Sequence, residues 1–186
     1  MDSGAISYRR FLEGDDRSLA DLIEEYRMPL QFFLFSVAGN RDIAEEATIE
    51  TFVKLATKKP KYKGKASFKT WLFIIGRNTA VDMLRKHKKN KLLSLEDAGI
   101  YVTDMDDSPE DLYIKEECNH QLTASMKKLK KEYYEVLWLK YFENLNVKEI
   151  ACIMHKSENN TKVLLNRARE ALKVQLGKDG FDCEDK

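Results

Sequence analysis

The chain has 186 residues, of which 43% are hydrophobic and 34% are charged, and its formal net charge at pH 7 is +1. This composition allows one large or two small domains with a buried core, and the longest nearly apolar run, residues 30–39, is too short to cross a bilayer. Three widely spaced cysteines favour a reducing compartment over a disulfide framework, and no basic segment followed by an apolar run marks a secretory signal, so we expect a cytoplasmic protein.

The near-neutral total conceals charge that is segregated along the chain. Residues 1–53 hold 5 basic and 11 acidic side chains, and residues 58–91 hold 12 basic and one acidic. Residues 94–119 hold one basic and 9 acidic, and residues 120–176 hold 11 basic and 6 acidic. A single charge run is commonly a solvated surface, but four alternating blocks favour separate surfaces for a polyanion and for a protein partner.

Two helices are predicted in the first third of the chain. Helical periodicity covers residues 18–38, where Pro29 should kink or split the helix because proline lacks an amide hydrogen. Asp42 and Glu45 have the spacing of a capping box for the second helix, which should end near Lys58.

The second helix is expected to have two different faces. Its inward face should hold Ala44, Thr48, Thr51, Phe52 and Leu55. Its outward face, at i, i+3, i+4 and i+7 spacing, holds Glu46, Ile49, Glu50 and Val53. Aliphatic groups among carboxylates suit a protein-docking surface, although isolated apolar residues are common on any surface.

A basic loop over residues 59–65, with Pro60 and Gly64, precedes a third helix expected over residues 67–88. The core-facing side of this helix holds Leu72, Phe73, Gly76, Ala80, Met83 and Leu84. The opposite side holds Trp71, Ile74, Ile75, Asn78, Asp82 and Arg85. Apolar, amide and guanidinium groups followed by lysines suit a surface for unpaired bases and phosphates. The alternative is a helix buried on both sides, with Trp71 as part of the core.

The periodicity fades over residues 90–108, where Gly99 and acidic clusters predict a linker, and helical patterns return from Glu110 onwards. Asn146 and Glu149 then have capping-box spacing, and a new helix should begin at Ser157. The first of these helices can pack through Ile150, Ala151 and Met154, and the second carries Lys162, Arg167, Arg169 and Lys173. This is a helix-turn-helix pattern whose second helix would enter a major groove through residues 158–161, although helical hairpins that bind nothing share the spacing.

Three segments in this order resemble one family. IAEEATIETF, FKTWLFIIGRNTAVDMLRK and the stretch from EIA to RAR are similar to bacterial sigma factors of the extracytoplasmic-function group. In that group the first segment docks on the clamp helices of RNA polymerase, the second opens and recognises the promoter minus-10 element, and the third recognises the minus-35 element. The acidic linker is threaded towards the polymerase active-site cleft and RNA exit path.

We therefore expect an all-α protein made of two small helical domains joined by a flexible acidic linker, the C-terminal domain containing the helix-turn-helix. The resemblance assigns residues 1–90 to sigma region 2, 91–117 to the linker, 118–178 to sigma region 4 and 179–186 to a tail. The expected function is promoter-specific transcription initiation with core polymerase, without catalysis. A stand-alone helix-turn-helix regulator that binds duplex DNA without polymerase is the alternative, and a helical scaffold with no DNA role is a third.

The resemblance also implies three sets of site residues. The minus-10 set is Lys61, Lys63, Lys65, Lys69, Trp71, Arg77, Asn78, Arg85 and Lys86. The minus-35 set is Ser157, Glu158, Asn160, Thr161, Lys162, Arg167 and Arg169. The polymerase-binding set is Glu45, Glu46, Ile49, Glu50 and Val53.

The chain departs from the family pattern at several of these positions. Ile49 replaces a usual glutamine, and Ile74 and Ile75 replace a tryptophan pair of housekeeping relatives, so strand opening should depend on a well-matched promoter. His155 replaces a turn glycine, and histidine tolerates a left-handed backbone better than most residues. Four residues of the recognition helix differ from the usual ones, so the minus-35 sequence cannot be carried over: Asn160, Thr161, Val163 and Leu164.

The expected partners are bacterial core RNA polymerase, promoter DNA and an anti-sigma factor, with no membrane insertion. No cofactor is expected. A zinc site formed by Cys118, His120, Cys152 and His155 is disfavoured because residues two apart do not share a helix face. The sequence also holds no glycine-rich phosphate loop or nucleophile elbow.

Overall fold

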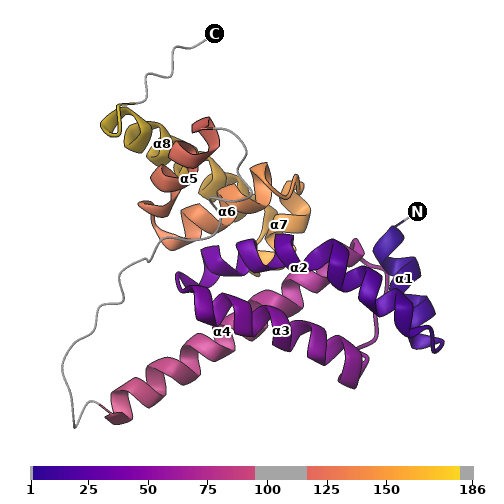
Figure 1. Cartoon of the computed structure of the whole chain (residues 1–186). Helices are drawn as coiled ribbons and strands as arrows, with labels where there is room; N and C mark the ends of the chain where they lie inside the picture. The colour runs from indigo at the N-terminus through magenta and orange to yellow at the C-terminus, as the bar shows by residue number, and fades with distance from the viewer. Residues whose placement is uncertain (1, 95–116, 181–186) are drawn as a thin grey trace. The chain divides into compact units, whose positions relative to one another are not determined.

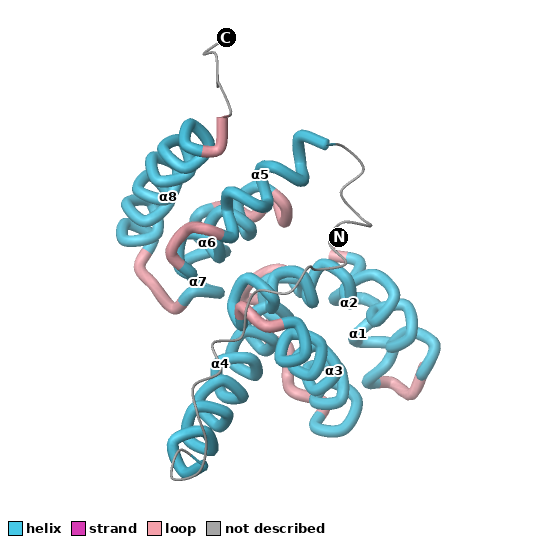
Figure 2. The backbone as a smooth tube through the Cα atoms, turned by 60° about the vertical axis from the view of Figure 1, so that its left-hand side comes forward, coloured by secondary structure: helices cyan, strands magenta, loops and turns pink. Residues whose placement is uncertain are grey.

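The structure, a computed structural model, describes residues 2–94 and 117–180, and every regular element in these ranges is a helix. The chain divides into two compact units, Met1–Met105 and Asp106–Lys186, as the two-domain prediction requires (Figures 1 and 2). Residues 95–116, which hold most of the predicted acidic linker, and residues 181–186 of the predicted tail lie outside the described ranges. None of the described helices is long and apolar enough to cross a membrane.

Within residues 2–94, the first unit consists of four helices that pack on one another (Figure 1). They are α1 (Ser3–Leu12), α2 (Asp16–Ala38), α3 (Arg41–Lys58) and α4 (Phe68–Ser94). The core is largely aliphatic and aromatic, and its fully buried side chains include Leu22, Leu30, Phe33, Leu34, Leu55, Phe68, Leu72 and Phe73. Gly76 and Ala80 are buried as well, so the predicted core-facing side of α4 is confirmed as far as Ala80, whereas Met83 and Leu84 are half-buried.

The structure excludes a split of α2 at Pro29 and corrects the expected cap of α3. Pro29 lies inside a continuous α2 and does not split it, because burial of Tyr26, Leu30 and Phe33 holds both halves of the helix against the core. The N-cap of α3 is Asn40, whose Oδ1 accepts a hydrogen bond from the backbone N of Ile43 at 3.0 Å. Asp42 is already helical, so it lies in the first turn of α3 and does not begin it.

Two further boundaries differ from the prediction. Helix α1 was not expected, although Asp2 caps it by accepting a hydrogen bond from the backbone N of Ala5 at 3.3 Å. Helix α4 begins where predicted, with the backbone N of Thr70 donating to Ser67 Oγ at 3.2 Å, but it continues six residues beyond the expected end, from 88 to Ser94.

The second unit contains α5 (Glu117–Lys127), α6 (Lys131–Tyr141), α7 (Val147–Met154) and α8 (Glu158–Lys178). Helix α8 packs against the other three. Val136, Leu137 and Leu139 of α6 are buried, and Trp138 stacks on Phe142 with ring centroids 4.2 Å apart.

The predicted helix-turn-helix is confirmed as α7, a short turn and α8. Asn146 and Glu149 form the capping box of α7 through two reciprocal 3.0 Å hydrogen bonds between side chain and backbone. His155 ends α7 in the left-handed region, with φ 53° and ψ 44°, and Ser157 then caps α8. The turn therefore keeps its geometry without glycine.

Candidate nucleic-acid and protein interfaces

The outward face of α3 has the composition that the sequence predicted. Ile49 and Val53 are 54% and 44% exposed, and Glu46 is also exposed, whereas Glu45 and Glu50 are half-buried. All five inward-facing residues of the prediction are buried. Thr48 and Thr51 satisfy their buried hydroxyls by donating to the carbonyl oxygens of Ala44 and Ala47, at 2.7 and 2.6 Å.

An apolar groove adjoins this face. It has a volume of about 420 Å³ and is lined by Leu19, Ile23, Arg27, Thr48, Ile49, Phe52, Val53 and Ala56. The α2 side of the groove was missed from the sequence, because only the packing of α2 on α3 brings Leu19 and Ile23 beside Ile49. Aliphatic groups bordered by carboxylates can bury apolar area against a partner that carries basic groups around an apolar centre.

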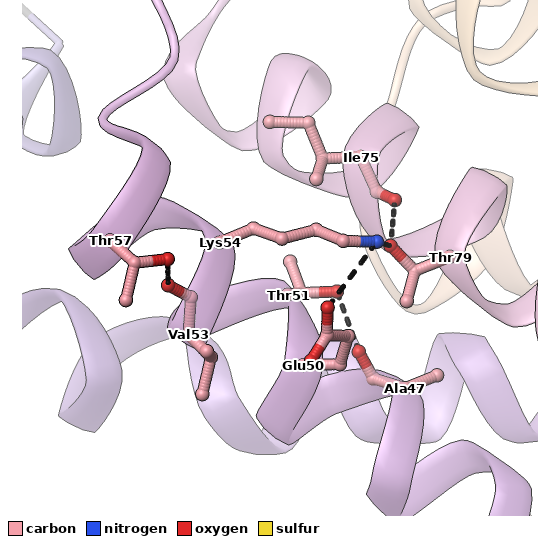
Figure 3. Close-up of polar contacts among 8 residues, drawn as sticks. All are labelled: Ala47, Glu50, Thr51, Val53, Lys54, Thr57, Ile75 and Thr79. Atoms are coloured by element: carbon pink, nitrogen blue, oxygen red, sulfur yellow. Dashed lines mark hydrogen bonds and ion pairs between the residues drawn. The ribbon is translucent and has the colours of Figure 1, made fainter.

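A lysine joins the acidic side of α3 to α4 (Figure 3). Lys54 Nζ donates to Thr79 Oγ1 at 2.9 Å and lies 3.8 Å from Glu50 Oε1. The Thr79 hydroxyl in turn donates to the carbonyl oxygen of Ile75 at 2.9 Å. This contact orients Glu50, and the sequence could not show it because Lys54 and Thr79 are 25 residues apart.

In the basic loop between α3 and α4, the lysines point to solvent and the aromatic residue packs against the unit. Lys61, Lys63 and Lys65 are exposed, whereas Tyr62 turns inwards and donates its hydroxyl to the carbonyl oxygen of Ala66. The Tyr62 ring lies 5.2 Å from the ring of Trp71, centroid to centroid. Three ammonium groups are thus presented to solvent by a loop anchored beside an aromatic cluster, which suits backbone phosphates next to a stacking surface.

The sequence left open whether Trp71 lies in the core or on a surface for unpaired bases, and the structure gives it features of both. Its ring contacts those of Tyr8 and Phe68, with centroids 5.3 and 5.5 Å away, so it belongs to the aromatic cluster. The side chain is nevertheless only half-buried. Asn78 and Arg85 follow at seven-residue steps, which keeps them on the same side of α4, and both are exposed.

The remaining minus-10 candidates differ in their exposure and in the contacts that they already make. Lys86 is exposed, and Arg77 is half-buried. Arg85 forms a 3.4 Å ion pair with Asp82 within the exposed surface of α4. The Lys69 ammonium lies 5.6 Å from the centroid of the buried Phe73 ring, which draws part of this side chain towards the core.

On the second unit, the predicted minus-35 residues lie at the start and outer face of α8. Ser157, Glu158, Asn160, Lys162, Arg167 and Arg169 are exposed. Ser157 Oγ accepts a hydrogen bond from the backbone N of Asn160 at 3.2 Å, so its hydroxyl already serves as the cap. Arg169 Nε donates to the Tyr141 hydroxyl at 2.7 Å, which anchors this guanidinium on α6.

Thr161 requires a correction. Its side chain is 0% exposed, and its hydroxyl donates to the carbonyl oxygen of Ser157 at 3.0 Å. Thr161 therefore packs inside the helix-turn-helix and does not face DNA. Val163 was not included in the predicted set, yet it is 42% exposed beside Lys162.

No three His, Cys, Asp or Glu side chains gather as a metal site within the described ranges. Cys152 is a free, exposed thiol. The side chains of Cys118 and His120, the other half of the disfavoured zinc set, lie outside what the structure describes.

Comparison with known proteins agrees with this arrangement. The Sigma-70 region 2 model matches residues 22–90 and the Sigma-70, region 4 model matches residues 119–172, which together exceed half of the chain. SigM of Bacillus subtilis strain 168, an ECF RNA polymerase sigma factor, is 34% identical over 158 residues, covering 84% of this chain and 94% of SigM. SigW of the same strain, also an ECF RNA polymerase sigma factor, is 29% identical over 171 residues, covering 88% of this chain and 91% of SigW.

A solved structure shares the fold. The sigma factor RpoE from Bartonella quintana, crystallised with the anti-sigma factor NepR, aligns with a TM-score of 0.66 at 21% identity, covering 84% of this chain and 97% of RpoE. One matched region lies in each of the two helical units. The chain therefore belongs to the sigma-70 family, in its extracytoplasmic-function group of RNA polymerase sigma factors.

Proposed function

We propose that this sigma factor binds core RNA polymerase through the outward face of α3 and the adjoining α2–α3 groove, and directs it to promoters with both helical units. The first unit captures an unpaired minus-10 base between the basic loop and Asn78. The second unit places the start of α8 in the major groove of the minus-35 element. The protein acts in the cytoplasm with the polymerase, by binding and not by catalysis.

One observation carries this proposal. Within one small unit, an apolar groove lies on α2 and α3 and shares Ile49 and Val53 with the outward face of α3, which also carries Glu46 and Glu50. A lysine loop, a half-buried tryptophan and an exposed amide lie on the adjoining loop and α4. A stand-alone helix-turn-helix regulator needs neither surface. An anti-sigma factor, such as the one bound to RpoE, is a further partner that we propose for this chain.

A pair of variants separates the two surfaces. Asn78→Ala should lower open-complex formation on a cognate promoter by roughly ten-fold, since a lost base contact costs about 1–3 kcal/mol. Its affinity for core polymerase should stay unchanged. Glu50→Lys should weaken polymerase binding in a pull-down, whereas Glu13→Lys, a charge reversal at the exposed residue that follows α1, should not.

The alternatives have their own readout. A mobility-shift assay on promoter DNA, with and without core polymerase, should show a specific shift only when core polymerase is present. A shift with the free protein alone would support a stand-alone regulator, and no shift in either case would support a scaffold. Loss of both polymerase binding and promoter opening in Asn78→Ala would contradict the assignment of these two roles to separate surfaces.

A further inference from the structure

Helix α1 lies before the segment that matches sigma region 2, yet it contacts both ends of the basic loop. Its cap residue, Asp2, serves two helices at once. Oδ1 accepts a hydrogen bond from the backbone N of Ala5 in α1, and Oδ2 accepts one from the backbone N of Phe68, the first residue of α4. One carboxylate therefore joins the start of α1 to the point where the loop ends.

The approach of α1 to α4 is as close as a glycine allows. Gly4 is buried, and a Cβ atom at this position would lie 2.5 Å from Phe68 Cδ1 and 2.8 Å from the Tyr26 hydroxyl oxygen. Neither ring can withdraw freely, because Tyr26 and Phe68 contact each other with centroids 5.6 Å apart. The backbone of α1 is thus held against the first turn of α4.

The other end of the loop is held by the second half of α1. Tyr8 is 1% exposed, and its hydroxyl donates to the carbonyl oxygen of Pro60 at 2.8 Å across 52 residues of sequence. A phenol is protonated at neutral pH in any case, and burial raises the pKa of Tyr8 further, to about 12. The Lys59 ammonium lies 4.8 Å from the centroid of the Phe11 ring, which adds a second contact at the same point.

Between these two contact points the loop exposes Lys61, Lys63 and Lys65, and the Tyr62 ring contacts the Trp71 ring. The Tyr8 ring contacts Trp71 as well, at 5.3 Å. Helix α1 therefore contacts both ends of the loop and the neighbouring Trp71. A loop of this kind would otherwise lose conformational entropy when it closes on a ligand, and such ordering reduces affinity.

We propose that α1 is a positioning element for minus-10 capture, in which Asp2 and Tyr8 hold the basic loop and Trp71 in the geometry that receives an unpaired base. This inference rests on the proposed function of the loop. Asp2 and Tyr8 do not touch DNA in this scheme. They act through the residues that do, by preorganising them before DNA binds.

The test uses full-length protein assembled with core polymerase and a promoter selected from a random library by that holoenzyme. The probe is a forked duplex with a single-stranded minus-10 non-template segment. A second series of probes replaces each unpaired base in turn by an abasic site. The variants are Tyr8→Phe, which removes only the hydroxyl, and Asp2→Asn, with Tyr133→Phe in the second unit as the matched control.

Wild-type holoenzyme should lose affinity for the probe in which the captured base is missing. Tyr8→Phe should bind the intact fork roughly five-fold more weakly, because one buried hydrogen bond is lost, and should bind the abasic probe as the wild type does. Asp2→Asn should behave in the same way, whereas Tyr133→Phe should match the wild type on both probes. Polymerase affinity should stay unchanged in all three variants.

The outcomes separate this inference from the function on which it rests. If removing each base in turn leaves wild-type affinity unchanged, base capture fails and the role of α1 falls with it. If base removal weakens the wild type but Tyr8→Phe and Asp2→Asn bind the intact fork normally, α1 has no positioning role although capture stands. Equal losses on the intact and abasic probes would indicate general destabilisation and would also overturn the inference.

Discussion

Val163 is an apolar side chain where most of its exposed neighbours on α8 are polar or charged. It is 42% exposed in the second turn of the helix, immediately after Lys162. In a major groove, an aliphatic group of this size contacts the C5-methyl of thymine. Val163 therefore predicts a thymine preference within the minus-35 element, at a position not inherited from the usual family sequence.

Replacing single thymines of the selected minus-35 element by deoxyuridine removes only the methyl group. Wild-type holoenzyme should bind one such probe about three-fold more weakly, because the affinity change per buried methyl group is small. Val163→Ala should be insensitive to that same replacement, and fluorescence anisotropy measures both. If the two proteins respond alike at every thymine, Val163 does not contact a methyl group.

The errors at single residues have a common physical origin. Spacing alone cannot choose between Asn40 and Asp42 as the cap of α3, because both side chains can accept a hydrogen bond from a backbone amide nearby. Thr161 was assigned to DNA because it lies at the start of the predicted recognition helix. It is buried with Leu165 and Ala168, its neighbours at i+4 and i+7, and its hydroxyl is satisfied within its own helix. Burial is decided by packing, which one sequence does not display.

At the scale of elements, the C-terminal end of α8 is fixed by Asp179. Its carboxylate accepts hydrogen bonds from Lys128 Nζ at 2.7 Å, Ser125 Oγ at 2.6 Å and Gln175 Nε2 at 3.1 Å, which ties α8 to α5 and the turn after it. These bonds, led by that of Lys128, lower the pKa of Asp179 to about 2 from its ordinary value of 3.8.

The sign of the pH effect follows from the direction of this shift. A carboxyl with a lower pKa in the folded state contributes stability above pH 3.8, and this contribution disappears as the pH falls towards 2. Asp179→Asn should therefore lower the urea midpoint of the second unit at pH 5 but leave it nearly unchanged at pH 2. The effect should be modest, because exposed ion pairs are screened by solvent.

Asp21→Asn, on exposed α2 surface in the other unit, is the matched control and should not alter the urea midpoint of the second unit. Trp138 fluorescence reports on that unit, since Trp138 is buried in α6. An equal loss for Asp179→Asn at both pH values would show that the side chain acts through packing and not through its charge.

Some helices were predictable from local signals and others were not. Helices α3, α7 and α8 combine apolar periodicity with nearby capping residues, so their existence and faces could be inferred. Helix α1 has ten residues, includes Gly4 and shows only Asp2 as a start signal, so local propensity alone does not favour it. Its stability comes from Tyr8 and Phe11, whose partners lie far along the chain.

At the scale of the whole molecule, the two-unit division followed from charge blocks and helix breakers. Only part of the candidate polymerase-binding site could be predicted from the sequence. The carboxylates and aliphatic groups of α3 share one helix, so periodicity finds them. Leu19, Ile23 and the Lys54–Thr79 contact join different helices, and no spacing rule connects them. Contacts between different helices form the shared surface, and these contacts cannot be inferred from the sequence alone.

If both units bind DNA phosphates, both should contribute to the salt dependence of holoenzyme–promoter affinity. Each single-strand phosphate neutralised contributes about 0.7 to the log–log salt slope of binding, and each duplex phosphate about 0.9. Replacing Lys61, Lys63 and Lys65 by Gln should therefore lower the slope of holoenzyme–promoter binding by roughly two, on the single-strand value. Replacing Lys162 and Arg167 by Gln should also lower it by roughly two, on the duplex value.

Because the two sets of residues lie in separate compact units, their effects should add. The combined variant should lose roughly four units of slope, measured by anisotropy of a labelled promoter between about 50 and 200 mM salt. Lys156→Gln is the control, because that ammonium is already paired with Glu132 at 3.3 Å. A combined loss no greater than that of one set would mean that only one unit meets phosphate, since charges that bind DNA independently release their counterions independently.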